Sequence, residues 1–469
     1  MVQFIRSGRQ TKTDRIVDSI AAQIGSGLLN EGDRLPSIRA AAKEFNVSKN
    51  TVVEAYDRLV AKGQITARPG SGFSVAPTAR PPRSETAPRH VVEAVDSVSL
   101  LRAQLDQNYA VRVGDGRPPP SWMAGLSLRL PRNQLAEAEQ NTSGYGSAMG
   151  HAALRQLIAA RHQLDGIPLE PEQIVTTFGA NHALDLIVRR YLSPGDTVLV
   201  DEPGYYPLFA KLKLAQVNYV GVPRGGTGPD LDRLKEIALR ERPKIYFTQS
   251  TAHNPTGGSY DLATSHGLLT LAETCNFLVV DDDPFSDLPG PRGIRLAALD
   301  RFTHVIGVGT FSKTLSASFR TGYVAARPEI VAEIAELKML TTVNSSRFSE
   351  MIITEMIRNR TYERHLKRLS QRLVHASELL TRNLAELGLA CRIPPGQGYY
   401  AWLDLPDGVS DTELAHAAAR EGIFLAPSTF FSVASQPQPA GMRLNITRTD
   451  DARFFTFLRR ELCQASGSG

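Results

Sequence analysis

The sequence predicts a multi-domain protein in which a small, α-rich N-terminal module precedes a larger α/β body. Three observations lead to this fold class. The chain has 469 residues, which is enough for two to four domains. Apolar side chains recur at helical spacing up to about residue 62. From about residue 100 onward, short β-branched runs alternate with helical periods, which is typical of βαβ units and a largely parallel sheet.

The N-terminal module is expected to contain three helices and a β-hairpin. Apolar residues at four-residue steps predict a first helix over residues 11–28. Ser37 and Ser48 each precede an apolar period, so they are expected to cap a second and a third helix. Residues 64–66 and 73–75 flank a glycine-bearing turn, which predicts a short hairpin.

A proline-bearing stretch separates the two parts of the chain. Four prolines and scattered Arg and Ser lie within residues 77–92, which is typical of a stiff, solvated linker. We therefore divide the chain into a module over residues 1–76, a linker over 77–99 and a body over 100–465. The predicted strands of the body include Thr197–Val200, Lys244–Thr248, Phe277–Val280 and Val305–Val308.

Positive charge is concentrated near the N-terminus. Residues 1–90 contain 14 Lys and Arg against 8 Asp and Glu, whereas the remainder contains 39 against 40. This contrast indicates a module that binds a polyanion, although a solvated basic surface has the same charge. No apolar run is long enough to cross a membrane, so we expect no membrane partner. Cys275, Cys391 and Cys463 lie far apart, so we expect no metal site, and their odd, sparse number fits a reducing cytoplasm.

The third predicted helix opens with residue types that suit DNA. Ser48, Lys49, Asn50 and Thr51 provide short donors and acceptors and one cation at a helix N-terminus, which fits base edges and phosphates in a major groove. The glycine-rich turn at Gly70 lets backbone approach a groove closely. A capped helix in a small structural domain is the alternative explanation.

The module resembles the winged helix-turn-helix of the GntR family of bacterial repressors over about residues 11–76. The matching stretches are Gly32–Ser37, Val47–Tyr56 and Gly70–Phe73. The resemblance implies binding to double-stranded operator DNA. It places Arg39, Lys49, Asn50, Thr51 and Gly70 at DNA contacts. The family often has arginine in place of Lys49, and lysine does not read guanine bidentately.

Several motifs of the body suit a phosphate-bearing aldehyde cofactor. Lys313 follows a predicted strand, and a lysine at a strand end can form a Schiff base with an aldehyde. Thr310 and Arg320 flank this lysine with a hydroxyl and a cation, which suit a phosphate dianion. Ala180 and Asn181 open a predicted helix, whose first N–H groups would face the same anion.

Four further residues fit the ring and the substrate of such a cofactor. Asp282 ends a predicted strand, where a buried carboxylate can hold a pyridine nitrogen protonated. Asn254 can donate to the phenolic oxygen, and Tyr205 can stack on the ring. Arg443 can pair with a substrate carboxylate. Each residue alone has an ordinary structural explanation, but their joint order and spacing favour one site.

In this order the motifs resemble the fold-type I pyridoxal-phosphate enzymes of the class I aminotransferase group, over about residues 140–450. The resemblance implies a large domain with a mixed, mostly parallel sheet, a small C-terminal domain, and pyridoxal 5'-phosphate as the cofactor. It assigns Lys313 as the catalytic aldimine lysine, Asp282 as the pyridine partner, Asn254 as the phenolate partner and Tyr205 as the stacking ring. It assigns the phosphate to Thr310, Arg320, Ala180, Asn181 and, from the neighbouring subunit, Tyr145, and the substrate or effector carboxylate to Arg443.

One residue departs from that pattern. The family usually has a tyrosine shortly after the aspartate, and its hydroxyl bonds the phenolic oxygen. Phe285 stands at this position and cannot make the bond. We expect cofactor binding to survive and the tuning of the imine pKa to change.

The two halves together resemble the MocR subfamily of transcriptional regulators. That resemblance implies a homodimer, typically head-to-tail, whose body senses a small amino compound by aldimine exchange at Lys313 and so changes DNA binding. Two alternatives stay open. One is a catalytically active aminotransferase that carries a DNA-binding module, and the other is a DNA-binding protein whose body is only a dimerisation scaffold.

Overall fold

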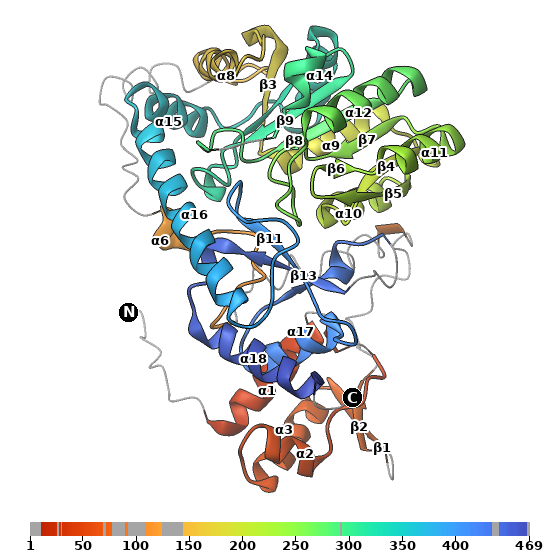
Figure 1. Ribbon diagram of the computed structural model, residues 1–469, viewed down its shortest axis with the longest axis vertical. Helices are drawn as coiled ribbons and strands as arrows, with labels where there is room; N and C mark the ends of the chain where they lie inside the picture. The colour runs from red at the N-terminus through yellow and green to blue at the C-terminus, as the bar shows by residue number, and fades with distance from the viewer. Residues whose placement is uncertain are drawn as a thin grey trace.

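The computed structural model describes residues 11–25, 28–29, 31–68, 72–76, 90–91, 109–123, 144–290, 293–433 and 440–466. Three parts follow one another along the long axis of the molecule: the N-terminal module, a three-stranded sheet with its helices, and a large sheet domain (Figure 1). The predicted linker over residues 77–99 lies outside the described residues, apart from positions 90 and 91.

The N-terminal module consists of three helices and an antiparallel hairpin, as predicted. Its elements are α1 (Lys12–Gly25), α2 (Ile38–Glu44), α3 (Lys49–Ala61), β1 (Ile65–Arg68) and β2 (Gly72–Val75). The side chain of Ser37 accepts the backbone N–H of Ala40, and that of Ser48 accepts the N–H of Thr51. Both predicted caps are therefore confirmed, and they fix where α2 and α3 begin.

One side of α3 forms the core of the module. Val52, Ala55, Tyr56 and Leu59 recur at helical spacing and are fully buried. The Tyr56 hydroxyl donates to the carbonyl oxygen of Pro36 at 2.9 Å, which ties α3 to the segment before α2. Because this stripe faces inward, the first turn of α3 stays at the surface.

The large domain is built on an eight-stranded mixed sheet with the order β3-β10-β9-β8-β7-β4-β5-β6. Strands β9, β8, β7, β4 and β5 run parallel, whereas β10 is antiparallel to β9 and β3. All four predicted strands are present within it. The strands are β3 (Ile174–Thr177), β4 (Thr197–Glu202), β5 (Asn218–Gly225), β6 (Gly228–Pro229), β7 (Ile245–Thr248), β8 (Leu278–Asp283), β9 (Val305–Thr310) and β10 (Gly322–Ala325).

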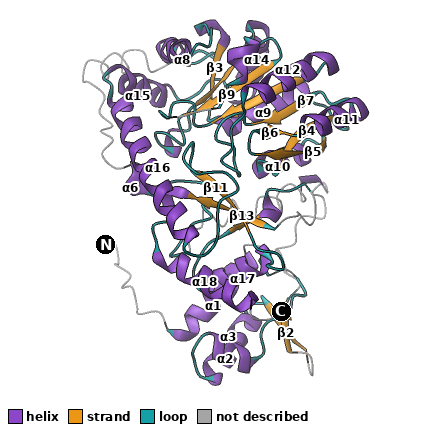
Figure 2. Cartoon of the chain, viewed as in Figure 1, coloured by secondary structure: helices purple, strands orange, loops and turns teal. Residues whose placement is uncertain are grey.

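Helices pack against this sheet (Figure 2). They are α8 (Ala152–Leu164), α9 (Ala180–Tyr191), α10 (Tyr206–Leu214), α11 (Leu231–Glu241), α12 (Leu262–Cys275), α13 (Leu296–Asp300) and α14 (Pro328–Thr342), and α15 (Arg347–Arg358) packs against α8. Gly322 of β10 allows a close approach of the chain before α9, because a Cβ there would lie 2.8 Å from the Cα of Gly179. Helix α9 therefore begins directly against the sheet.

A smaller domain is built on the antiparallel sheet β11-β13-β12. Its elements are α16 (Thr361–Ala385), β11 (Tyr400–Asp404), α17 (Asp411–Arg420), β12 (Ala426–Pro427), β13 (Gly441–Asn445) and α18 (Ala452–Ser466). Residues 109–123, which end in α6 (Pro120–Met123), join this domain because the Asn445 N–H donates to the Val113 carbonyl at 2.7 Å. The expected pair of a large and a small domain is confirmed.

The N-terminal module rests on the small domain. Helix α1 packs against α17 (Figure 1). The Arg420 Nε of α17 lies 2.7 Å from the Glu44 Oε1 at the end of α2. Ile20 and Tyr56 of the module and His416 of α17 line a cleft of about 540 Å³ at this contact.

Two searches of the described residues bear on membranes and metals. No described helix is both long and apolar enough to cross a bilayer. No group of three or more described His, Cys, Asp or Glu side chains is arranged to hold a metal ion. Cys275, Cys391 and Cys463 are all free thiols.

The substitution Leu59→Ala tests the core of the module. It leaves a cavity behind α3, so we expect the free energy of unfolding of the module to fall by about 2–5 kcal/mol. Hydrogen exchange of the α3 amides in the full chain measures the change. Val53→Ala is the matched control, because Val53 lies on the same helix and is 37% exposed. It should change the free energy of unfolding by no more than about 0.5 kcal/mol. Equal exchange in the two variants would contradict the burial of this stripe.

Candidate functional site

The predicted cofactor residues gather at the carboxyl edge of the large sheet. Asp282 lies near the end of β8, Thr310 is the last residue of β9, and Lys313 follows three residues later. Because parallel strands end at the same edge, residues that are distant in sequence become neighbours there. This edge faces the small domain (Figure 1).

Lys313 points into the interface between the two domains. Its Nζ donates to the carbonyl oxygen of Gly116 at 2.6 Å and lies 5.7 Å from the centre of the Tyr400 ring. The Tyr400 hydroxyl donates to the same carbonyl at 2.9 Å. The hydroxyl of Tyr399 donates to the backbone carbonyl of Lys313 at 2.8 Å, which anchors the lysine at a second point.

Asp282 is a buried carboxylate with only one of its two oxygens satisfied. Its Oδ2 accepts a hydrogen bond from Gln249 at 2.8 Å. Its Oδ1 is buried and has no hydrogen-bond partner among the described residues. Burial raises the pKa of Asp282 to about 7, and the hydrogen bond from Gln249 opposes that rise. The free oxygen is suited to a donor from outside the chain, such as a protonated pyridine nitrogen.

Arg443 and Asn254 meet across the boundary between the domains. Arg443 is 1% exposed on β13, and its guanidinium donates to Asn254 Oδ1 at 3.0 Å and to the Gly114 carbonyl at 2.7 Å. Its Nε is buried without a described partner. Because the amide oxygen of Asn254 accepts from Arg443, its NH2 group is the end left to donate to a ligand.

Tyr205 lies beside the buried carboxylate. It precedes α10 and lines a small cavity together with Asp282, Gln249 and His253. Burial raises the pKa of Tyr205 well above its ordinary value, so the phenol stays neutral. The position suits an aromatic ring that covers one face of a planar ligand.

The predicted phosphate residues lie around the start of α9. Gly179 caps the helix, and Ala180 and Asn181 form its first turn. Arg320 donates to the Phe178 carbonyl at 2.8 Å, and a Cβ at Gly179 would lie 3.1 Å from the Arg320 Nη2. The structure therefore brings a cation to a helix N-terminus, which is an anion-binding arrangement.

Two predicted phosphate ligands are placed differently from this group. The Thr310 hydroxyl is buried at the end of β9, where it donates to the Thr321 carbonyl at 3.2 Å and accepts from the Ser312 N–H. Tyr145 is 86% exposed on this chain. Its assignment to the site of a neighbouring subunit stays a prediction.

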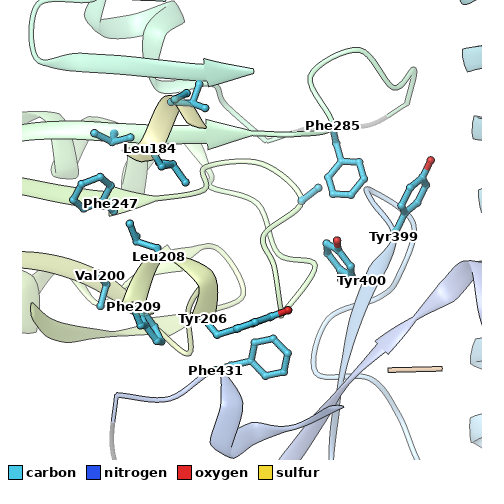
Figure 3. Packing of buried hydrophobic residues seen from close by; sticks show 14 of the residues in the cluster. Leu184, Val200, Tyr206, Leu208, Phe209, Phe247, Phe285, Tyr399, Tyr400 and Phe431 are labelled. Carbon is cyan, nitrogen blue, oxygen red and sulfur yellow. The ribbon is translucent and has the colours of Figure 1, made fainter. Parts of the chain in front are cut away.

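Phe285 is buried where the related enzymes usually have a tyrosine. Its ring packs edge-on against Tyr399 at 5.0 Å and Tyr400 at 5.8 Å between ring centres (Figure 3). The two tyrosine hydroxyls that bond the Lys313 carbonyl and its partner carbonyl, Gly116, thus come from β11 of the small domain and the residue before it. Sequence reasoning missed Tyr399, Tyr400, Gly116 and Gln249; the adjacent pair of tyrosines before a short apolar run was the one available signal.

The predicted DNA residues lie at the start of α3 and on α2. Lys49 and Asn50 are exposed, and Arg39 is exposed on α2. Ser48 caps the helix, and its hydroxyl is 2.8 Å from that of Thr51, so these two side chains pair with each other. Gly70 lies outside the described residues.

Two family models match the chain. The model described as "Bacterial regulatory proteins, gntR family" matches residues 12–75, and "Aminotransferase class I and II" matches residues 108–458. The two matches cover the N-terminal module and the body respectively.

Two relatives named as transcriptional regulators align with most of the chain. The chain is 32% identical to the "Uncharacterized HTH-type transcriptional regulator YdcR" of Escherichia coli (strain K12), over 90% of this chain and 92% of that protein. It is 26% identical to the HTH-type transcriptional regulator NorG of Staphylococcus aureus (strain USA300), over 79% and 86% of the two chains.

A solved structure shows the same fold as the body. LysN, an alpha-aminoadipate aminotransferase from Thermus thermophilus complexed with N-(5'-phosphopyridoxyl)-L-leucine, superposes with a TM-score of 0.69 at 25% identity. The match covers 80% of this chain and 98% of LysN. The predicted fold class is therefore confirmed.

The substitution Asp282→Asn tests the cost of the buried carboxylate. The folded pKa of about 7 lies above the ordinary value of 3.8, so the native state of the cofactor-free protein binds the extra proton. Stability from this group is therefore present at low pH and is lost as the pH rises from about 4 to 7. We expect the Tm of the wild type to fall relative to that of Asp282→Asn as the pH rises through this window.

Differential scanning calorimetry of the cofactor-free protein between pH 5 and 8 measures this effect. Asp281, whose pKa burial raises to about 6, and the buried His162 and His253, whose pKa burial lowers to about 4, contribute slopes of opposite sign that the two proteins share. If the Tm of the wild type and of Asp282→Asn changed with pH by the same amount, burial of the ionised Asp282 carboxylate would not destabilise the protein.

Proposed function

The chain belongs to the aminotransferase class I and II family and also contains a gntR-family domain, which together form the architecture of the MocR subfamily. From that premise we propose that it is a transcriptional regulator that senses an amino compound by aldimine exchange at Lys313. Members of this family bind pyridoxal 5'-phosphate, and the gntR domain is a DNA-binding module. Bound at Lys313, the cofactor supplies an aldehyde carbon that exchanges one amine for another. We assign the regulator's module to residues 1–76, its linker to 77–99 and its body to 100–465.

The convergence of Lys313, Asp282 and Arg443 is the observation that carries this proposal. With the cofactor bound, the amine of the effector would take the place of the Lys313 amine, and the three N–H hydrogens of the incoming ammonium would pass to the lysine nitrogen. The Gly116 carbonyl, which accepts a hydrogen bond from Lys313 Nζ at 2.6 Å, is placed to hold the released ammonium. The exchange consumes no water, oxidant or reductant, so the regulator holds its ligand without destroying it.

The surrounding residues take the roles that their positions support. Asp282 holds the ring nitrogen through its free Oδ1, and Asn254 donates to the phenolic oxygen. Tyr205 covers one face of the ring. The phosphate is held by Ala180, Asn181, Thr310, Arg320 and the Tyr145 of a second subunit.

Arg443 selects an effector that carries an anion as well as an amine. Its guanidinium is buried, and its Nε lacks a described partner. A carboxylate that binds bidentately through Nε and Nη2 would satisfy this nitrogen and exchange for the present bond of Nη2 to the Gly114 carbonyl. The effector is therefore a small amino acid or a related amino anion.

DNA is contacted by the exposed start of α3. Lys49 and Asn50 point outward there, and Arg39 is exposed on α2. Thr51 and the Ser48 that caps the helix complete the set, together with Gly70, which is outside the described residues. The N-terminal module contacts α17 through α1, and this contact leaves Lys49 and Asn50 exposed.

The signal passes through the small domain. Arg443 is paired in register with Trp402 of β11 and Ala426 of β12, and α17 lies between those two strands in the chain. A ligand that moves Arg443 moves this sheet and, with it, the helix against which α1 rests. The two arrangements differ in energy because only one of them pairs the effector with Arg443.

A head-to-tail homodimer completes the site. Leu340 and Phe348, which flank the turn between α14 and α15, are 85% and 53% exposed. The Gly146 beside Tyr145 lies against Asn344 of the same turn. An apolar surface next to an exposed tyrosine suits a second copy that receives Tyr145.

An active aminotransferase is the second candidate. The nearly complete residue set and the aminotransferase fold favour it, whereas Phe285 removes one hydroxyl from the expected set. Many turnovers per site with an amino donor and a keto acid would favour the enzyme. Ligand binding without turnover would favour the regulator.

The substitution Lys313→Ala removes the amine on which sensing depends. After incubation with pyridoxal 5'-phosphate, we expect the wild type to absorb in the near-ultraviolet to violet from the imine, and Lys313→Ala to lose this band completely. Lys244→Ala, at a 53% exposed lysine, is the matched control and should keep it. A wild type without the band would refute the sensor.

The Glu44–Arg420 ion pair tests the route from the body to DNA. We expect Glu44→Gln and Arg420→Met to change the ratio of operator affinities with and without amino acid by up to about fivefold, because a partly exposed pair contributes at most about 1 kcal/mol. The double variant should change this ratio of affinities no more than either single variant does.

Operator DNA selected from random sequence and a panel of amino acids serve as probes in this measurement. Glu31→Gln, at an exposed position of the module, is the control and should leave the ratio unchanged. The imine spectrum should be unchanged in all variants. Additive effects of the two substitutions would exclude this contact from the route.

A further inference from the structure

Gln249 connects two residues of the site that approach a ligand from different sides. It directly follows β7 and is 4% exposed. Its Nε2 donates to Asp282 Oδ2 at 2.8 Å, and its Oε1 accepts the backbone N–H of Asn254 at 2.6 Å. One amide thus touches both the residue suited to a ring nitrogen and the residue suited to a phenolic oxygen.

The orientation of this amide is fixed by its partners. The Asn254 N–H can only donate, so the oxygen of Gln249 must face it. The NH2 group is then forced toward Asp282, where it favours the ionised carboxylate. The side chain cannot flip without losing both hydrogen bonds inside a buried site.

The other charged and titratable groups near Asp282 do not replace this contact. Asp281 and Asp283 on the same strand repel its charge, and Lys313 attracts it. Tyr205 is kept neutral by burial, and burial lowers the pKa of His253 to about 4. His253 lies 3.3 Å from Asp201 and is directed to that carboxylate. Gln249 is the only described hydrogen-bond donor to the Asp282 side chain.

We propose that Gln249 is a positioning residue that keeps Asp282 ionised for a ring nitrogen and holds Asn254 in register for the phenolic oxygen of the same ring. This inference rests on the proposed function, because it concerns the cofactor of that site. It links the two electronic contacts of the ring through one side chain. A substitution at position 249 is therefore expected to alter the contact of Asp282 with the ring nitrogen and that of Asn254 with the phenolic oxygen together. Residue 249 itself contacts neither of these two ring atoms.

Two variants at position 249 give opposite dependences on pH. Gln249→Leu removes the donor, so Asp282 holds its proton more tightly. The cofactor must then displace that proton, and its affinity falls most at low pH. Gln249→Glu restores both hydrogen bonds while it is protonated, but places a second carboxylate against Asp282 once it ionises. Its affinity therefore falls most at high pH.

The experiment measures the affinity for pyridoxal 5'-phosphate by fluorescence titration between pH 6 and 8.5, in the full chain with Lys313→Ala as the common background. This background removes covalent attachment, so that the readout is binding rather than imine formation or activity. Relative to that background, Gln249→Leu should bind at least about tenfold more weakly at pH 6, and the loss should shrink as pH rises. Gln249→Glu should show the reverse trend.

Ser250→Ala is the matched control. The Ser250 hydroxyl donates to the neighbouring Asp281 at 2.6 Å, so the variant removes a comparable buried hydrogen bond one residue away. It should leave cofactor affinity within about twofold at every pH. The cofactor-free proteins provide a second readout, because Gln249→Leu should extend the fall of Tm with pH, relative to the wild type, above 7.

The possible outcomes distinguish a failure of the positioning role of Gln249 from a failure of the proposed function. Losses that are equal at all pH values would assign Gln249 a purely structural role and overturn this inference, while the proposed function stands. Failure of the Lys313→Ala background and of the wild type to bind the cofactor would overturn both. Opposite pH trends in the two variants, with an unchanged control, would support the positioning role.

Discussion

The burial of the Asp282 carboxylate is the constraint on which the body depends. A charged group enclosed at a sheet edge is costly unless partners meet it. Gln249 satisfies one oxygen, and the other has no described donor. The pocket is therefore incomplete as folded, and a cationic ring nitrogen lowers its energy. Stability of the body and affinity for the cofactor are two consequences of one electrostatic term.

Arg443 extends this constraint across the domain boundary. It belongs to the small domain, yet it donates to Asn254 of the large domain. In the proposed regulator, an effector carboxylate would compete for the same guanidinium, so that the bond of Arg443 Nη2 to the Gly114 carbonyl would be exchanged for one to the ligand. This exchange gives the ligand the differential interaction energy that any switch requires. The contact of α17 with the N-terminal module then gives it a mechanical route outward.

Local features were predictable from the sequence, and long-range contacts were not. The caps at Ser37 and Ser48 depend on residues within three positions, and the parallel strands depend on short β-branched runs. The contact of Lys313 with Gly116 joins residues 197 positions apart, so no local pattern encodes it. The resemblance to known families supplied the residues of the site, because their order along the chain is specific although each one alone is common.

The position of the tyrosines favours a sensor over an efficient enzyme. A tyrosine at position 285 would belong to the large domain and would stay beside the ring whichever position the small domain takes. With Phe285 there, the hydroxyl that shares the Gly116 carbonyl with Lys313 is that of Tyr400, on β11 of the small domain. The polar surroundings of the lysine therefore change whenever the small domain moves. An enzyme loses from this dependence, because its lysine must keep one environment through a cycle. A regulator gains from it, because the state of the imine and the position of the small domain then determine each other.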